Sequence, residues 1–254
     1  MARDKKTYNT PDGLRFAASG AFSNASMAWI LYYIWSLLVG SILKAQGITG
    51  YVLTVVGYVI MFYAAIRTFT GLEAEIQADS IRNETPDRSL PVMKKLVIVS
   101  IVVSVICRIL LILLSILRDN TILSLEEQVR PASEEAYQVA FAAAMLKFSR
   151  YNAMVNIPGA IFTTVNLLAV FSYKIFVADG KSPSIRRFSI ASLVLCIVHL
   201  LTAEIKYLLT LLRPSSSFSV LSFIVSATAV VSYFTLYLMF EARKNKYGKS
   251  MKQQ

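Results

Sequence analysis

The sequence predicts an all-α, polytopic integral membrane protein: a bundle of six transmembrane helices with both termini in the cytoplasm. Three observations lead to this prediction, namely the composition, the apolar segments and the placement of the basic residues. Hydrophobic residues make up 56% of the 254 residues and charged residues only 16%, and the mean hydropathy is +0.56. Soluble domains carry about 25% charged residues, so we expect this chain to reside in a membrane.

The apolar residues are concentrated in six segments, each close to the roughly 20 residues that a helix needs to cross about 30 Å of hydrocarbon. These segments are 25–43, 51–66, 96–117, 157–177, 188–212 and 218–240. The first follows a basic N-terminus without a small-residue cleavage site, which predicts an anchor and not a removed signal peptide. We therefore expect a cytoplasmic segment over 1–23, a six-helix transmembrane domain over 24–241 and a basic cytoplasmic tail over 242–254.

The basic residues predict the orientation. Most of the 26 lie before the first segment, between the second and third, between the fourth and fifth, or after the sixth, and in a six-helix bundle these regions share one side. The positive-inside rule makes that side cytoplasmic. Attraction to anionic lipids at this basic face is expected as a secondary effect. No motif or compact basic domain connects the net charge of +11 with nucleic acid.

Two loops are long enough to carry structure of their own. The inner one, over 72–92, is interpreted as an extension of the second helix that ends in a turn. The outer one contains a helix-start signal, Ser133 followed by Glu134 and Glu135. It predicts an amphipathic helix near 133–152 on the outer surface, or a long extension of the fourth span. A seventh crossing is disfavoured, because it would move the basic C-terminus outside.

Two charged residues lie deepest in the predicted helices: Arg108 in the third and Glu204 in the fifth. At 1.5 Å per residue, Arg108 lies about 15 Å below Arg118, and Glu204 lies about 13.5 Å below Arg213. An isolated charge at mid-membrane costs at least about 2.5–3.5 kcal/mol, and a partner at the same depth lowers that cost. We therefore hypothesise that Arg108 and Glu204 form an ion pair.

Further polar residues are found nearby. At 100° per residue, His199, Thr202 and Lys206 share one face of the fifth helix, and Asn166 lies in the fourth. Together with the charged pair, they predict an intramembrane polar site between the third, fourth and fifth helices. Structural interpretations stay open: the pair could fix the helix register, His199 could be a hydrogen-bonded packing residue, and Lys206 could extend outward to the interface.

The sequence argues against an enzyme, a metal site or a bound cofactor. All aspartates fall in loops or tails, which excludes an intramembrane aspartyl protease with two helix-borne aspartates. There is one histidine, and the two cysteines, Cys107 and Cys196, lie in separate helices, where we expect them to be buried without a disulfide. No phosphate-binding glycine motif occurs.

Two functions remain. The preferred one is a small transporter or permease component of the cell membrane, with Arg108 as an anion contact and a partner ATPase or other subunit supplying energy. The alternative is a non-transporting membrane subunit or accessory protein that docks partner proteins through its outer helix and inner loop. Mid-membrane helix breaks, which many transporter sites require, are missing from the sequence, and this makes the preference narrow.

Overall fold

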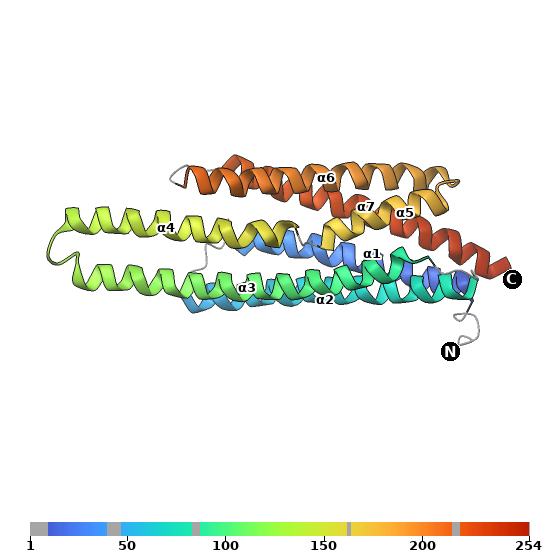
Figure 1. Cartoon of the computed structure of the whole chain (residues 1–254), viewed down its shortest axis with the longest axis horizontal. Helices are drawn as coiled ribbons and strands as arrows, with labels where there is room; N and C mark the ends of the chain where they lie inside the picture. The colour runs from blue at the N-terminus through green and yellow to red at the C-terminus, as the bar shows by residue number, and fades with distance from the viewer. Residues whose placement is uncertain (1–9, 40–46, 83–86, 162–163, 215–218, 254) are drawn as a thin grey trace. The chain divides into compact units, whose positions relative to one another are not determined.

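The computed structural model describes residues 10–39, 47–82, 87–161, 164–214 and 219–253, and this part of the chain is helical without strands (Figure 1). The helices are α1 (Pro11–Leu37), α2 (Gly47–Arg82), α3 (Ser89–Gln128), α4 (Glu134–Ile161), α5 (Thr164–Asp179), α6 (Pro183–Leu212) and α7 (Ser219–Gln253). The all-α prediction is confirmed. As expected, α2 extends well into the loop over 72–92.

Four of these helices, α2, α3, α6 and α7, are long and apolar enough to cross a membrane. The fourth predicted span, 157–177, does not correspond to a single described helix, because α4 ends at Ile161 and α5 begins at Thr164. Pro158 lies inside α4, three residues before its end. Proline removes a backbone hydrogen bond and the following Gly159 is a weak helix former, so α4 is weakened at these two positions.

The chain divides into two compact units. Unit 1 comprises Met1–Ile101, Thr164–His199 and Ser226–Gln254, and unit 2 comprises Val102–Thr163 and Leu200–Val225.

The core of unit 1 contains a group of aromatic rings in close contact. Phe22 of α1 is fully buried, and its ring centroid lies 4.7 Å from that of Phe171 on α5 and 5.0 Å from that of Phe240 on α7. Gly71 of α2 packs directly against Phe22, where a Cβ atom would lie only 2.7 Å from the ring. These contacts bring four helices of unit 1 together around one ring.

Unit 2 contains an antiparallel hairpin of α3 and α4. The Tyr137 hydroxyl of α4 donates a hydrogen bond to Glu126 of α3 at 3.4 Å, and near the other end Gly159 packs against Cys107. The predicted helix start is confirmed, since the Ser133 hydroxyl accepts a hydrogen bond from the backbone N–H of Ala136 at 3.2 Å. The predicted outer helix is thus the first part of the longer α4.

Large apolar side chains cover the outward face of α3. Val102, Ile106, Ile109 and Leu113 recur at helical spacing, and each is about half exposed, between 50% and 53%. Soluble monomers rarely expose so large a continuous apolar surface. This face is typical of a helix that contacts lipid. Cys107 and Cys196 are both buried and free, as the sequence predicted.

Candidate functional site

Unit 2 contains a polar cavity of about 290 Å³ between α3, α4 and α6. Its lining combines polar side chains with a few apolar ones. The lining residues are Arg118, Met145, Phe148, Ser149, Asn152, Ala153, Asn156, Lys206, Tyr207 and Thr210. None of the described residues that line it is acidic.

Two of the lining residues are cationic. Arg118 is neutralised by its neighbour, since its Nη2 and Nε atoms donate to Asp119 Oδ1 at 2.8 and 2.9 Å. Lys206 is half-buried, and its ammonium group makes no hydrogen bond or ion pair within the described chain. The Lys206 charge is therefore the one at this cavity that has no counter-charge among the described residues.

Two neutral polar side chains lie beside this charge. Ser149 and Asn152 both line the cavity from α4, and neither side chain hydrogen-bonds to another residue of the part of the chain that the structure describes. The walls themselves are fixed by local bonds: Asn156 Nδ2 donates to the Asn152 carbonyl, and the Thr210 hydroxyl donates to the Lys206 carbonyl. The cavity thus offers hydrogen-bond donors that the described residues leave unused.

The residues of the predicted intramembrane site are distributed over both units. Lys206 lines the cavity of unit 2, whereas His199 belongs to unit 1. The His199 ring nitrogens lie 3.4 Å from the Tyr33 hydroxyl and 3.4 Å from the Thr228 hydroxyl, which is the arrangement of a hydrogen-bonded packing residue. Thr202 is half-buried on α6. Asn166 lies in α5, and its side chain is outside the described part.

Arg108 of α3 and Glu204 of α6 both belong to unit 2 and are both half-buried. The contacts described for the two residues do not include one between them, and the hypothesised pair stays a prediction. Arg108 takes part in other interactions. One carboxylate oxygen of Glu204, Oε1, is buried without a hydrogen bond. Equal depth was the basis of the hypothesis, but depth alone does not determine which helix faces meet.

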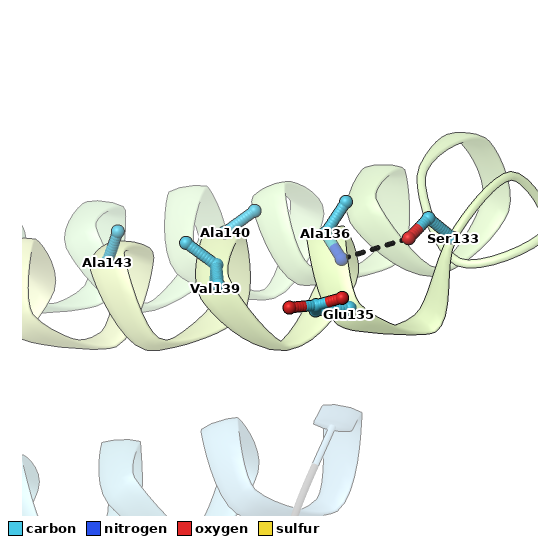
Figure 2. Close-up of a pocket in the computed structure, with 6 residues that line it drawn as sticks. All are labelled: Ser133, Glu135, Ala136, Val139, Ala140 and Ala143. Atoms are coloured by element: carbon cyan, nitrogen blue, oxygen red, sulfur yellow. Dashed lines mark hydrogen bonds between the residues drawn. The ribbon is translucent and has the colours of Figure 1, made fainter.

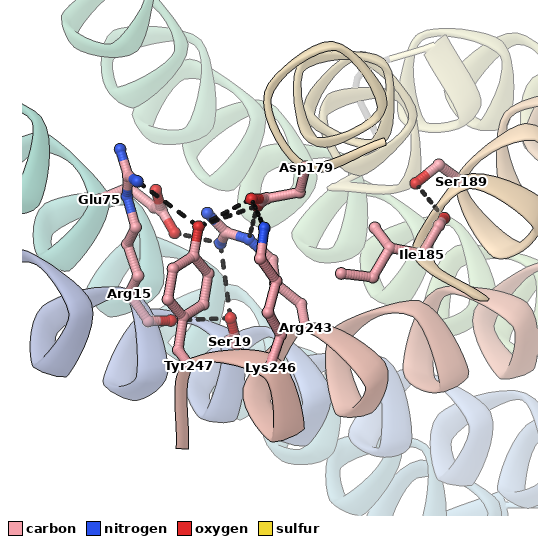
Figure 3. Close-up of polar contacts among 9 residues, drawn as sticks. All are labelled: Arg15, Ser19, Glu75, Asp179, Ile185, Ser189, Arg243, Lys246 and Tyr247. Atoms are coloured by element: carbon pink, nitrogen blue, oxygen red, sulfur yellow. Dashed lines mark hydrogen bonds and ion pairs between the residues drawn. The ribbon is translucent and has the colours of Figure 1, made fainter. Parts of the chain in front are cut away.

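A second polar feature is a buried ionic cluster in unit 1. Figure 3 shows the Arg243 guanidinium of α7 between the carboxyl groups of Glu75 (α2) and Asp179 (α5), and hydrogen bonds connect all three. The Arg243 Nε atom donates to Asp179 Oδ2 at 2.9 Å, and Nη1 donates to Glu75 and, at 3.4 Å, to Ser19 of α1. These four residues are at most 5% exposed. One guanidinium therefore links four helices.

Two further residues of α7 complete the cluster. Lys246 Nζ lies 2.5 Å from Asp179 Oδ1, and the Tyr247 hydroxyl donates to the same oxygen at 2.8 Å. Burial alone would raise the pKa of Asp179, but the Arg243 guanidinium and the donated hydrogen bonds outweigh burial and hold that pKa at about 2. Burial acts to lower the pKa of Arg243, and the two carboxylates overcome it and raise that pKa. Both groups are therefore charged at neutral pH.

The sequence did not single out this cluster. Arg243 follows an apolar segment directly, and basic residues in that position are ordinarily solvated and mark the inner side of a membrane. The one available signal was that Glu75 and Asp179 are acidic residues in inner regions that also carry many basic ones. Because Arg243 and these two carboxylates are all predicted on the inner side of the membrane, they could pair. The sequence does not show that the paired groups are buried.

A shallow groove runs along the first turns of α4. It is lined by Ser133, Glu135, Ala136, Val139, Ala140 and Ala143, and Figure 2 shows these side chains, most of them short, along the same helix. Small residues at such spacing allow a neighbouring helix to approach closely.

The comparisons with known proteins give no further assignment. No family model matches the chain, and no curated protein and no solved structure matches it significantly.

Proposed function

We propose that this protein is a small transporter or permease component of the cell membrane that binds a small solute in the cavity of unit 2. The observation that carries this proposal is the convergence of unused polar side chains, Ser149, Asn152 and Lys206, on one cavity between apolar helices. Polar residues within membrane helices are costly, and they commonly mark a ligand or ion path. A partner ATPase or other subunit would supply energy.

The size of the cavity supports a small solute. Sites for drug-sized ligands occupy about 300–1,000 Å³, and the volume of about 290 Å³ lies just below that range. Lys206 lies seven residues before Arg213, or about 10 Å along the helix. The cavity would therefore be reached from the side of the membrane on which α6 ends.

We further propose that the six apolar segments cross the membrane and that both termini are cytoplasmic. Contacts within unit 1 support a shared side for the termini, since the Ser250 hydroxyl of α7 donates to Asp12 of α1 at 2.6 Å. Lys94 of α3 also pairs with Glu73 of α2 at 2.8 Å. The same end of unit 1 thus carries several basic segments, and the positive-inside rule places it in the cytoplasm.

The transport proposal is tested by solute entry into liposomes that contain the purified full chain. Stopped-flow swelling is recorded with a panel of small neutral, cationic and anionic solutes. We expect at least one class to enter faster than into protein-free liposomes, and Ser149→Trp, which fills the cavity, to abolish the difference. Ser124→Trp is the matched control, because Ser124 is exposed on α3 and does not line the cavity. Equal rates for all solutes with and without protein would refute transport.

A second candidate, a non-transporting subunit, is favoured by the groove on α4. There the alanines 136, 140 and 143 would accept a helix of a partner membrane protein. Ala140→Leu fills the groove without adding charge, and it should release a partner that co-purifies with the wild-type chain. Retention of that partner by the variant would argue against docking at this groove.

A further inference from the structure

We infer that the unit 2 cavity binds an oxyanion, the carboxylate or phosphate group of a small solute or of a lipid headgroup, with Lys206 as its counter-charge. This inference rests on the proposed solute-binding function and adds the chemical class of the ligand. It follows from the donors at the cavity: an ammonium, an amide and a hydroxyl are unused, and acidic groups are missing from its described lining.

The Lys206 ammonium is the group that most requires a ligand. It is half-buried among apolar helices and has no ion-pair partner in the described chain. Glu204, two residues earlier on α6, does not line the cavity. A buried charge is normally paired, so an anion in the cavity would supply the partner that the protein itself does not provide there.

Ser149 and Asn152 lie on α4, across the cavity from Lys206 on α6. A hydroxyl and an amide N–H₂ group donate hydrogen bonds in different directions, which suits the several acceptor oxygens of a carboxylate or phosphate. A cationic ligand would instead meet the Lys206 charge without a carboxylate to compensate it. The donor set therefore selects against cations.

The ligand has two sources, and one experiment distinguishes them. The purified full chain is placed in nanodiscs of phosphatidylcholine, and binding of inorganic phosphate and of acetate is measured by isothermal titration. In parallel, native mass spectrometry of nanodiscs with added phosphatidylglycerol records retained lipid. The variants are Lys206→Gln, Lys206→Arg and the control Lys147→Gln, which removes an exposed lysine of α4 outside the cavity.

We expect Lys206→Gln to weaken anion binding at least about tenfold, Lys206→Arg to retain most of it, and Lys147→Gln to behave as wild type. Binding of phosphate or acetate with this pattern supports a soluble ligand, and retention of phosphatidylglycerol alone with this pattern supports a headgroup. Anion binding that Lys206→Gln leaves unchanged overturns the inference. Thermal unfolding of each variant confirms that it is folded.

The failure of this inference can be separated from that of the proposed function. If Ser149→Trp abolishes entry of a neutral or cationic solute and no anion binds, the ligand class is wrong and solute passage stands. If neither anions nor any solute of the swelling panel interact with the protein, both are wrong.

Discussion

Asp179, the last residue of α5, and Arg243 of α7 form a buried ion pair across 64 positions of the sequence, with 2.9 Å between Oδ2 and Nε and 4% exposure of each side chain. Because Arg243 also bonds to Glu75, the pair connects α5, α7 and α2. Buried ion pairs contribute little net stability, since desolvation offsets the attraction, but the loss of one partner leaves an uncompensated charge. The pair therefore fixes how these helices meet.

The first prediction concerns the removal of one partner. Asp179→Asn keeps the shape of the side chain but leaves Lys246 without its carboxylate and Arg243 with Glu75 alone. We expect a loss of about 3–5 kcal/mol in the free energy of unfolding, as is typical when a buried pair is broken. The measurement is denaturant unfolding in detergent micelles.

The control for Asp179→Asn is Asp119→Asn. Asp119 pairs with Arg118 in a setting where the two side chains are 40% and 36% exposed, and exposed pairs contribute about 0–1 kcal/mol. A similar loss for both variants would show that burial of the Asp179 pair has no special effect.

The second prediction is the pH dependence of stability. The folded-state pKa of Asp179 is about 2, below the ordinary value of 3.8. A depressed pKa contributes stability that is fully present above the unfolded value and is lost as pH falls through the folded one. The free energy of unfolding should therefore fall by about 2 kcal/mol between roughly pH 5 and pH 2. Asp179→Asn should lack this portion of the acid dependence, and an identical pH profile for both proteins would contradict the assignment.

The fold was predictable where periodicity and local chemistry determine it. The apolar segments indicated an all-α membrane chain, and the sequence around Ser133 indicated where α4 begins. The side-chain contacts were harder, because a sequence gives the depth of a residue in a helix but not the helix face that a neighbour meets. The predicted depths of Arg108 and Glu204 do not show whether their faces meet, and the position of Arg243 after the last apolar segment did not indicate that it lies buried between two carboxylates.

The candidate site was predicted in part for the same reason. Lys206 was expected in a polar site between three helices, and it lines a cavity of this kind. Ser149 and Asn152 were not singled out, because they lie in a segment interpreted as an outer surface helix. Their position opposite Lys206 depends on the antiparallel return of α4 along α3, which apolar periodicity does not predict.

The third prediction concerns the contact of Gly71 with Phe22. A Cβ atom at position 71 would lie 2.7 Å from a ring that is itself packed between Phe171 and Phe240. Gly71→Ala should therefore destabilise the protein by about 1–3 kcal/mol. Gly20→Ala is the control, because the nearest atom to its Cβ lies at an ordinary 4.0 Å, and the better helix propensity of alanine should stabilise by about 0.5–1 kcal/mol. Stabilisation by both substitutions would mean that the ring can move aside.

The fourth prediction separates a ligand contact from a structural lysine. Without a ligand, the half-buried Lys206 charge has no ion-pair partner in the described chain and contacts only the Tyr207 ring, so Lys206→Met should raise the free energy of unfolding by about 0.5–2 kcal/mol. Lys147→Met, at an exposed position, should change it by less than about 0.5 kcal/mol. Thermal unfolding of the ligand-free protein measures both. A clear loss of stability in Lys206→Met would identify Lys206 as a structural residue.

The fifth prediction measures the charge that a solute meets in the cavity. Asn152→Cys places a thiol in the lining, and the native cysteines Cys107 and Cys196 are buried and should contribute little background. For each cysteine variant, the measured quantity is the ratio of the reaction rates of a negatively and a positively charged methanethiosulfonate. Because of the nearby Lys206 ammonium, this ratio should be higher in Asn152→Cys than in Asn120→Cys, which is at an exposed position outside the cavity. A unit charge a few ångströms away predicts a difference on the order of tenfold between the two sites. Adding Lys206→Gln to Asn152→Cys should remove most of this difference. The local potential acts on every charged solute that enters the cavity. If the rate ratio is the same at both sites, or does not change when Lys206 is replaced, the cavity therefore does not concentrate anions.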